Sequence, residues 1–349
     1  MSEPNTGLRM AIAGATGAVG QAMVEILAER PVPVSELRLL ASERSVGKRL
    51  PFRGKNLRVE LLDTFDFSNT DVALFSAGGE VSALHAPRAA AAGCLVIDNT
   101  SKFRYETDIP LVVPEVNAEA LAGFSARNII ANPNCSTMQL VVALKPIHDR
   151  NPIRRINVAT YQAVSGAGTA GIEELAAQTA ALLNGRGIDE PSVAARQIAF
   201  NAVPQIDQFQ DNGYTREEMK MVWEIAKIMG DDSIQVNPTC VRVPVFYGHS
   251  EAVHLELTDP VDPAAVADWL RQAPSIEVAD DAAAYPTAVE HGAGNDPVYV
   301  GRIRRDVSLV TGLNLWVVSD NVRKGAALNT VQITEELMAR GMLSAKPGS

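Results

Sequence analysis

The sequence predicts an α/β protein with two domains that differ in the pattern of their strands. Up to about residue 131, short apolar runs alternate with amphipathic segments, which indicates a parallel sheet with helices on both faces. Beyond that point, longer strands alternate apolar and polar residues, as antiparallel strands with one exposed face do. We therefore expect an open α/β domain over residues 1–133, completed by a C-terminal helix at about 325–349. Residues 134–324 should form an α+β domain with a mixed, largely antiparallel sheet.

Apolar periodicity places the individual elements. In the first domain, strands are expected at residues 8–13, 37–41, 57–62, 72–76, 95–98 and 128–131, and helices at 21–29 and 81–92. Pro31 and Pro33 end the first helix, because proline lacks the backbone N–H that a helix interior needs. Later strands are expected at 156–164, 239–247, 252–257, 298–303 and 309–318, and helices at 170–183, 216–228, 264–272 and 326–340. Residues 184–192 contain Gly, Asp and Pro and predict a surface loop.

Composition limits the class of protein. Hydrophobic residues make up 46% and charged residues 21%, which is typical of a globular protein. A net charge of −10 and a pI near 5.1 argue against a nucleic acid or a membrane as partner. The three cysteines give no disulfide framework and favour the cytoplasm. The first seven residues lack a signal-peptide pattern, and no apolar run reaches the ~20 residues of a membrane span. His and Cys residues are not spaced as metal ligands, so no metal is expected.

A glycine-rich turn joins the first strand to the first helix. Gly14-x-x-Gly17-x-x-Gly20 is a variant of the dinucleotide fingerprint, in which glycines let the N–H groups of a helix start approach a pyrophosphate. Such turns also serve plain strand-to-helix packing, but this position in an alternating half favours nucleotide binding. The same turn contains Thr16, Ala18 and Val19.

The segment after the second strand, Ser42-Glu43-Arg44-Ser45, indicates which dinucleotide binds. An acidic residue here would hold a ribose 2′-hydroxyl and favour NAD, whereas an arginine would accept the 2′-phosphate of NADP. Arg44 between Ser42 and Ser45 offers a guanidinium and two hydroxyls, all of which can donate to phosphate. We therefore expect NADP, with Glu43 turned to solvent; an ordinary charged loop is the alternative.

The segment Asn132-Pro133-Asn134-Cys135-Ser136-Thr137 lies between an apolar run and a stretch with helical spacing. This order predicts strand, tight turn and helix, with Cys135 in the first helical turn. Free N–H groups and the positive dipole end of a helix both stabilise a thiolate. Cys135 should therefore ionise more readily than a free cysteine, whose pKa is about 8.5. A small buried residue at a helix start is the alternative.

Further clusters place polar residues at positions that suit a site. Gln162 ends a predicted strand before Ala163-Val164-Ser165-Gly166-Ala167-Gly168, and Arg104 closes the segment Ser101-Lys102-Phe103-Arg104. Glu217 and Lys220 are three residues apart on a predicted helix and share a face. Arg242 lies in a strand, and His249 begins the next one after Gly248. Each cluster alone also has an ordinary explanation, such as a solvated ion pair or a turn histidine.

Together these motifs resemble one family, the aspartate-semialdehyde dehydrogenases. The resemblance runs from about Leu8 to Leu337. It rests on Gly-Ala-Thr-Gly-Ala-Val-Gly, Ser-Lys-Phe-Arg, Asn-Pro-Asn-Cys-Ser-Thr, Tyr-Gln-Ala-Val-Ser-Gly-Ala-Gly, Arg-Val-Pro-Val with a following Gly-His-Ser-Glu, and Asn321-x-Arg323-Lys324-Gly325-Ala326-Ala327, in family order. It implies a Rossmann-like NADP-binding domain and a catalytic domain that also forms a homodimer, with dimer versus tetramer left open.

The resemblance also implies a reaction, the NADPH-dependent reductive dephosphorylation of 4-aspartyl phosphate to L-aspartate 4-semialdehyde, with release of phosphate. It belongs to the biosynthesis of lysine, threonine and methionine. A Cys135 thiolate would displace phosphate and form a thioester, which hydride from the nicotinamide then reduces. His249 suits the general acid–base role because its reference pKa is near 6.5, and Gln162 would orient the thioester.

The family also implies binding roles for the remaining residues. Arg242 would hold the substrate carboxylate through a bidentate pair, and Glu217 would meet the substrate ammonium. Phosphate would be held by Arg104 and Lys220, with Asn134 nearby, and the cofactor would also contact Ser165, Gly166 and Asn321.

Other functions remain open at this point. N-acetyl-γ-glutamyl-phosphate reductase performs the same chemistry on a neutral, acylated amine, for which Glu217 would have no ammonium to meet. Glyceraldehyde-3-phosphate dehydrogenase would carry Ser-Cys-Thr-Thr, which is absent. A non-catalytic redox sensor would need the nucleotide turn but not Gln162, Arg242 and His249, and a cysteine hydrolase gives no reason for that turn.

Overall fold

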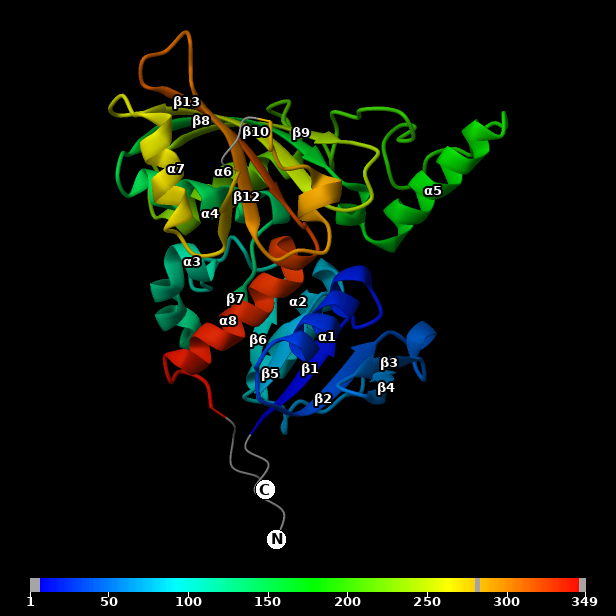
Figure 1. Ribbon diagram of the computed structural model, residues 1–349. Helices are drawn as coiled ribbons and strands as arrows, with labels where there is room; N and C mark the ends of the chain where they lie inside the picture. Colours follow the sequence, from blue (N-terminus) through cyan, green and yellow to red (C-terminus); the bar gives the residue numbers. More distant parts are fainter. Residues whose placement is uncertain (1–6, 280–282, 345–349) are drawn as a thin grey trace. The chain divides into compact units, whose positions relative to one another are not determined.

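The computed structural model describes residues 7–279 and 283–344. The chain divides into two compact units, one made of Met1–Pro133 with Ala326–Ser349 and the other of Asn134–Gly325. Residues 1–6 and 345–349, which belong to the first predicted domain, lie outside the described residues. Each unit contains its own sheet (Figure 1).

The first unit is built on a sheet with the order β3-β4-β2-β1-β5-β6-β7. Its strands are β1 (Leu8–Ala13), β2 (Val34–Ala41), β3 (Arg49–Phe52), β4 (Lys55–Leu61), β5 (Val72–Phe75), β6 (Leu95–Asp98) and β7 (Ile129–Ala131). All neighbouring pairs are parallel except β3–β4, which forms a hairpin. The central strands β5 and β6 are buried throughout, which explains their continuous apolar runs.

Helices complete the first unit. They are α1 (Ala18–Glu29), α2 (Gly79–Ala91), α3 (Pro114–Asn117) and α8 (Leu328–Ala339), with 3₁₀ turns η1 (Glu43–Ser45) and η2 (Ala118–Ala126). The C-terminal helix α8 lies beside α1 (Figure 1), and Arg30 at the end of α1 forms a two-point ion pair of 2.7 Å with Glu335 of α8. The end of the chain therefore returns to the unit in which it began.

The second unit is built on a mixed sheet with the order β11-β12-β13-β10-β8-β9. Its strands are β8 (Ile153–Gln162), β9 (Gln235–Arg242), β10 (His249–Leu257), β11 (Ile276–Val278), β12 (Val298–Arg305) and β13 (Gly312–Ser319). Pairings are antiparallel at β12–β13, β13–β10 and β10–β8, and parallel at β8–β9 and β11–β12. The predicted fold class, a parallel α/β sheet followed by a largely antiparallel one, is confirmed.

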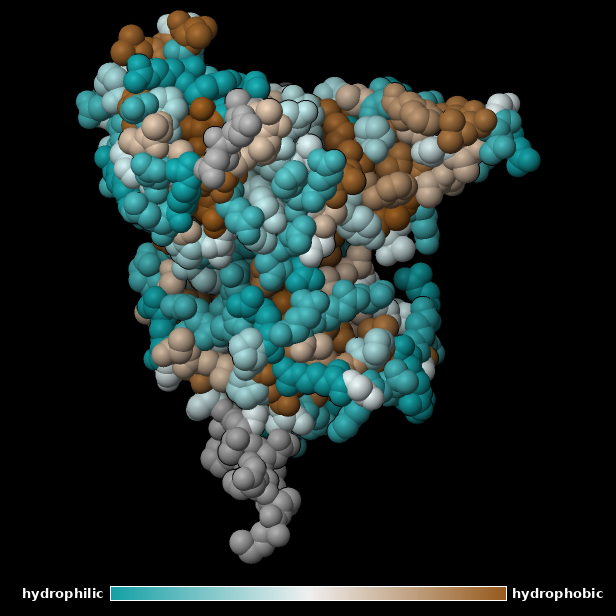
Figure 2. Space-filling view, in the orientation of Figure 1, coloured by the Kyte–Doolittle hydropathy of each residue, from teal (hydrophilic) through white to brown (hydrophobic). Residues whose placement is uncertain are grey.

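Three helices of the second unit pack against this sheet: α4 (Cys135–His148), α6 (Arg216–Met229) and α7 (Pro263–Arg271). Helix α4 also contacts α6 and α7. Helix α5 (Thr169–Leu183) projects away from the sheet in Figure 1 and ends in the exposed loop that was expected at 184–192. There are also three short helical turns: η3 (Val164–Ala167) follows β8, η4 (Ala288–Gly292) precedes β12, and η5 (Arg323–Ala327) follows β13. Figure 2 shows exposed apolar residues over α5 and at the tip of the β12–β13 hairpin.

Some predicted boundaries were wrong. The strand expected at 239–247 ends at Arg242, because Pro244 cannot donate a ladder hydrogen bond. The edge strand β3 was not predicted, since Pro51 obscured its pattern, and the three-residue strand β11 was also missed. Within the described residues, no helix has the length and apolarity to cross a bilayer, and no cluster of three His, Cys, Asp or Glu could hold a metal.

Candidate active site

The glycine-rich turn of the first unit connects β1 to α1, as expected. Gly14 has φ +86°, and a Cβ there would lie 2.5 Å from the carbonyl oxygen of Ser76. A Cβ on Gly20 would lie 2.1 Å from the carbonyl oxygen of Gly14, so the helix can approach the turn only without a side chain. Helix α1 begins at a glycine N-cap and has no acidic residue in its first turn, so its N–H groups suit an anion such as a pyrophosphate.

The loop after β2 meets this turn. The Thr16 hydroxyl donates to the Ser45 hydroxyl at 3.2 Å, which links the glycine-rich turn to η1. Arg44 and Glu43 are both exposed on η1, so Glu43 is turned to solvent as predicted. The structure therefore brings Gly14, Thr16, Gly17, Ala18, Val19, Ser42, Arg44 and Ser45 into one region of the first unit.

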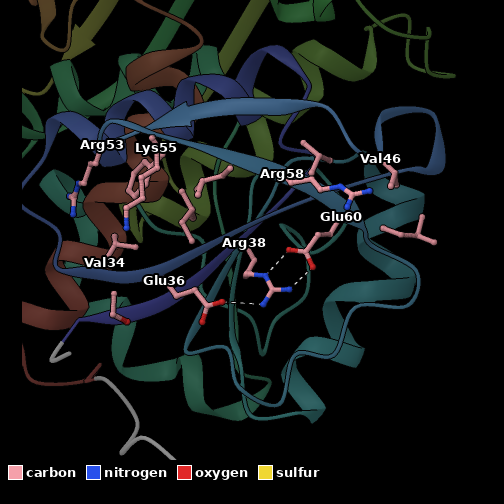
Figure 3. Close-up of a pocket in the computed structure, with 14 residues that line it drawn as sticks. Val34, Glu36, Arg38, Val46, Arg53, Lys55, Arg58 and Glu60 are labelled. Carbon is pink, nitrogen blue, oxygen red and sulfur yellow. Dashed lines mark hydrogen bonds and ion pairs between the residues drawn. The ribbon is translucent and has the colours of Figure 1, made fainter. Parts of the chain in front are cut away.

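A separate cavity of about 770 Å³ opens on the β2–β4 side of the same sheet (Figure 3). Arg38 lies across it and is hydrogen-bonded to Glu36 and Glu60, which neutralises its charge. Val34, Phe52 and Leu57 supply apolar walls. None of the predicted site residues lines this cavity, and we assign it no role in catalysis.

In the second unit, Cys135 is the first residue of α4, as predicted. Its neighbour Asn134 is the N-cap, and its Oδ1 accepts hydrogen bonds from the backbone N–H groups of Ser136 and Thr137 at 3.0 and 3.3 Å. Cys135 is half-buried, whereas Cys94 and Cys240 are buried. Burial raises the pKa of the Cys240 thiol well above its ordinary value. Cys135 is therefore the accessible thiol of the three, at a helix start that favours a thiolate.

The Cys135 sulfur lies 3.3 Å from Nε2 of His249. The other ring nitrogen, Nδ1, accepts a hydrogen bond from the backbone N–H of Ala163 at 3.0 Å, so it carries no proton. We therefore assign the proton of the neutral imidazole to Nε2, which faces the sulfur. In this tautomer His249 donates to a Cys135 thiolate.

Burial and the nearby positive charge of Arg242 lower the pKa of His249 to about 3. Because the ring is fully enclosed, this pKa lies well below the reference value near 6.5 that suggested a general acid–base role. At neutral pH His249 is a neutral donor. Nε2 of Gln162 lies 3.5 Å from Nε2 of His249, so two donors converge beside Cys135. Such a pair can hold an oxygen on which negative charge develops.

Glu217 connects these groups. Its Oε1 accepts from the side-chain amides of Asn134 at 2.9 Å and Gln162 at 3.1 Å, and its Oε2 accepts from Lys220 at 2.9 Å. Burial alone would raise its pKa, but the Lys220 charge and these hydrogen bonds outweigh that effect and lower the pKa to about 2. Glu217 is thus a buried carboxylate. A carboxylate has about four acceptor positions, so one position remains beyond these three bonds.

Lys220 lies between two carboxylates. Its Nζ lies 2.9 Å from a carboxylate oxygen of Glu217 and 3.0 Å from a carboxylate oxygen of Asp207. The contact with Glu217 agrees with the predicted shared face of the helix. Burial acts to lower the pKa of Lys220, but the two carboxylates raise it overall, so the side chain is an ammonium. Asp207 was not predicted, because it lies in a loop with no motif of its own.

Arg242 and the small-residue turn lie together beside His249. The Nη1 of Arg242 donates to the carbonyl oxygen of Ala163 at 2.7 Å. A Cβ on Gly166 would lie only 2.9 Å from this Nη1 atom. Arg242 also lines a cavity of about 230 Å³. Burial lowers its pKa, but from an ordinary value of 12.5 the guanidinium stays charged at neutral pH.

Asn321 joins the predicted cofactor residues of this unit. Its Nδ2 donates to the Ser165 hydroxyl at 2.9 Å, and its Oδ1 accepts from the backbone N–H of Gly248 at 2.9 Å. Ser165, Gly166 and Asn321 are therefore next to His249 in space, although they are far apart in sequence.

Arg104 is the predicted substrate-binding residue that belongs to the first unit. Its guanidinium is buried and donates to the carbonyl oxygens of Thr100 and Asn99 at 3.1 and 3.0 Å. The Asn99 side chain accepts from Asn132 at 2.6 Å, and Asn132 accepts from Asn329 of α8 at 2.7 Å. This buried asparagine chain ties the Arg104 loop to the strand end that precedes Cys135.

Two buried carboxyl groups close to Asn134 and His249 were not predicted. Glu224 of α6 accepts a hydrogen bond from the backbone N–H of Asn134 at 2.6 Å, and its spacing of seven residues from Glu217 was the signal that could have revealed it. Glu251 of β10 is fully buried, and its oxygens make no hydrogen bond with the residues that the structure describes. Burial raises the pKa of Glu251 well above its ordinary value.

Comparison with known proteins identifies the family to which this chain is similar. Residues 9–124 match the family "Semialdehyde dehydrogenase, NAD binding domain", and residues 144–324 match "Semialdehyde dehydrogenase, dimerisation domain". Aspartate-semialdehyde dehydrogenase 2 of Vibrio cholerae is 64% identical over 329 residues, which cover 94% of this chain and 97% of that protein.

Solved structures agree with this assignment. A crystal structure of aspartate semialdehyde dehydrogenase II from V. cholerae, complexed with ASA, superposes with a TM-score of 0.93 at 62% identity, covering 95% of this chain and 98% of that one. An aspartate semialdehyde dehydrogenase with NADP from Candida albicans superposes with a TM-score of 0.75 at 27% identity, covering 97% and 100%. The chain belongs to the aspartate-semialdehyde dehydrogenase family.

Proposed function

We propose that this chain converts 4-aspartyl phosphate and NADPH to L-aspartate 4-semialdehyde, phosphate and NADP⁺ through a thioester on Cys135. The observation that carries this proposal is the 3.3 Å contact between the Cys135 sulfur and the protonated nitrogen of His249 at a capped helix start. A thiolate held in this way is a nucleophile for the acyl phosphate carbon. The complex of the V. cholerae relative with ASA supports the substrate.

The chain's own residues then divide the work. The thiolate attacks the acyl carbon, the C–O bond to phosphate breaks, and phosphate leaves with its electron pair. The nicotinamide, when bound, supplies hydride to the thioester carbon. His249 and Gln162 donate hydrogen bonds to the oxygen that becomes negative when the thioester carbon is reduced. Collapse of this oxyanion breaks the C–S bond, forms the aldehyde C=O and restores the Cys135 thiolate, and His249 keeps its Nε2 proton throughout.

Binding of the substrate follows from the charged groups. Arg242 would hold the α-carboxylate, and Glu217 would accept the ammonium at its remaining position. Lys220 and Arg104 would hold the phosphate, with Lys220 aimed by Glu217 and Asp207. An ionised Glu217 favours a free amine over the acetylated amine of N-acetyl-γ-glutamyl phosphate, because only the free amine carries a charge.

NADP rather than NAD is the proposed cofactor, because Arg44 is exposed beside Ser45 at the loop that meets the glycine-rich turn. The C. albicans relative with NADP supports this choice. A homodimer is proposed through the second unit, which matches a dimerisation domain. The mechanism needs a free thiol, which fits the reducing cytoplasm expected from the sequence.

The thioester can be tested without phosphate. Semialdehyde and NADP⁺ alone should give one NADPH per active site and an aspartyl group on Cys135, measured by absorbance and by mass spectrometry of the intact protein. Added phosphate should release the group and start turnover. Cys135→Ser should show neither the burst nor the added mass while it binds NADPH within a few-fold of wild type. Steady turnover by Cys135→Ser would refute the covalent mechanism.

A further inference from the structure

Glu224 is the most completely enclosed carboxylate next to the nucleophile segment. Its exposure is 0%, and its Oε2 accepts the backbone N–H of Asn134, the residue before Cys135, at 2.6 Å. A charge-assisted bond of this kind is short and directional. A buried carboxylate is costly unless it is well hydrogen-bonded, so an apolar residue would be the ordinary choice for packing alone.

Helix α6 holds Asn134 at two points. Glu217 and Glu224 are seven residues apart, about two helical turns, and so lie on one face. Glu217 accepts the side-chain amide of Asn134, and Glu224 accepts its backbone N–H. The Oδ1 of Asn134 in turn accepts the N–H groups of Ser136 and Thr137, on the far side of Cys135. The peptide on each side of Cys135 is therefore fixed.

We propose that Glu224 is a positioning residue for catalysis, which sets the place of the Cys135 sulfur against His249 through the backbone of Asn134. This inference rests on the proposed role of Cys135 as nucleophile. The reach of the Glu224 carboxylate, and not its charge, is the property that matters. Misplacement of a reacting atom by about 1 Å costs on the order of a hundredfold in rate.

Three substitutions separate reach from charge. Glu224→Gln keeps an acceptor oxygen at the same distance without the charge, and should retain kcat within about threefold. Glu224→Asp keeps the charge but withdraws the carboxylate by one methylene, and Glu224→Ala removes it. Both should lower kcat on the order of a hundredfold with the semialdehyde KM nearly unchanged. The alkylation rate of Cys135 by iodoacetamide, measured across pH, should fall in the same two variants.

Glu218 offers a matched control on the same helix. Its buried carboxylate accepts hydrogen bonds from the backbone N–H groups of Thr215 and Cys240, at 2.6 and 3.0 Å. Within the described residues, Glu218 accepts no hydrogen bond from Asn134. Glu218→Ala should lower thermal stability at least as much as Glu224→Ala, yet leave kcat and Cys135 alkylation within about threefold of wild type.

Three results would overturn the proposal. These are an active Glu224→Asp with an inactive Glu224→Gln, an unchanged Cys135 alkylation profile in Glu224→Ala and Glu224→Asp, or equal losses of alkylation in Glu218→Ala. The Asp and Gln variants are conservative, so they keep the test decisive if the alanine variant fails to fold. Alkylation reports on the thiol without turnover, so failure of this proposal is distinguishable from failure of the thioester mechanism, which the Cys135→Ser experiment tests.

Discussion

At the scale of single residues, the state of His249 distinguishes this site from a pair in which thiolate and imidazolium attract each other. The ring is enclosed, its Nδ1 accepts from the backbone, and its pKa lies near 3. Ionisation of Cys135 therefore depends on the start of α4 and on the charge of Arg242. The acid limb of the pH–rate profile should accordingly report the thiol and not the histidine.

The preference between NADP⁺ and NAD⁺ should also depend on one residue, Arg44. Arg44→Ala should weaken NADP⁺ far more than NAD⁺, because only NADP⁺ has a 2′-phosphate to lose. A charge-assisted contact contributes about 1.5–3 kcal/mol, or roughly ten- to a hundredfold in affinity. Titration of both cofactors by fluorescence would measure the difference, with Glu43→Ala as the neighbouring control. Equal losses for both cofactors would remove Arg44 from the phosphate site.

A further residue prediction separates the two substrate anions. Arg242→Lys keeps the charge but loses the planar fork, so it should raise the semialdehyde KM or lower kcat strongly. Lys220→Ala and Arg104→Ala should act mainly on the phosphate dependence of the oxidative reaction. Kinetics with each substrate varied in turn would measure these effects. If Arg242→Lys changed only the phosphate KM, the two basic groups would have the opposite roles.

At the scale of elements, α4 and β10 each contribute a buried polar side chain, and these two side chains lie close together. Glu251 on β10 lies two residues from His249 and so on the same strand face, with Gln139 of α4 beside its carboxyl group. Gln139 lies four residues after Cys135, and therefore on the Cys135 face of its helix. The amide of Gln139 acts to lower the pKa of Glu251, but burial outweighs it.

A pH-dependent stability follows from this enclosed carboxyl group. Its pKa is raised in the folded state, so the folded protein binds a proton that the unfolded chain releases above a pKa of about 4.3. Its contribution to stability is therefore lost progressively as pH rises above that value. Glu251→Gln should raise the free energy of unfolding relative to wild type at pH 8 and much less at pH 4. Urea unfolding at both pH values tests this, and a difference that does not grow with pH would contradict it.

At the scale of the whole molecule, we propose that the homodimer forms through the outer face of the second unit's sheet. Tyr161 and Trp316 lie there with ring centroids 5.6 Å apart, and Ala252 is opposite Trp316 in the ladder. This face presents aromatic and small side chains, which suits contact between two flat sheets more than contact with water.

A substitution on this face can test whether it forms the interface of the proposed homodimer. Ala252→Arg places a long charge at the centre of the surface, and should shift the protein from dimer to monomer in light scattering after size-exclusion chromatography. Leu84→Glu, a change at a 70% exposed position on α2 of the first unit, should leave the dimer intact. A stable dimer of Ala252→Arg would place the interface elsewhere.

Features that depend on local chemistry could be predicted from the sequence alone. Strands β1 and β6 were predicted to the residue, and Cys135 was placed at a helix start, because apolar runs and turn residues act over a few positions. The glycine-rich turn and the shared face of Glu217 and Lys220 follow from the same short-range rules.

Features that depend on distant segments could be seen only once the chain was folded. His249 reaches Cys135 across 114 positions, and its tautomer is set by the N–H of Ala163, 86 positions away. Enclosure by these segments is what lowers the pKa of His249 and raises that of Glu251, and no local pattern reports it. Asp207 and Glu224 likewise join the site through pairings of separate elements, since hydrogen bonds in a folded core depend on distance in space and not on distance along the chain.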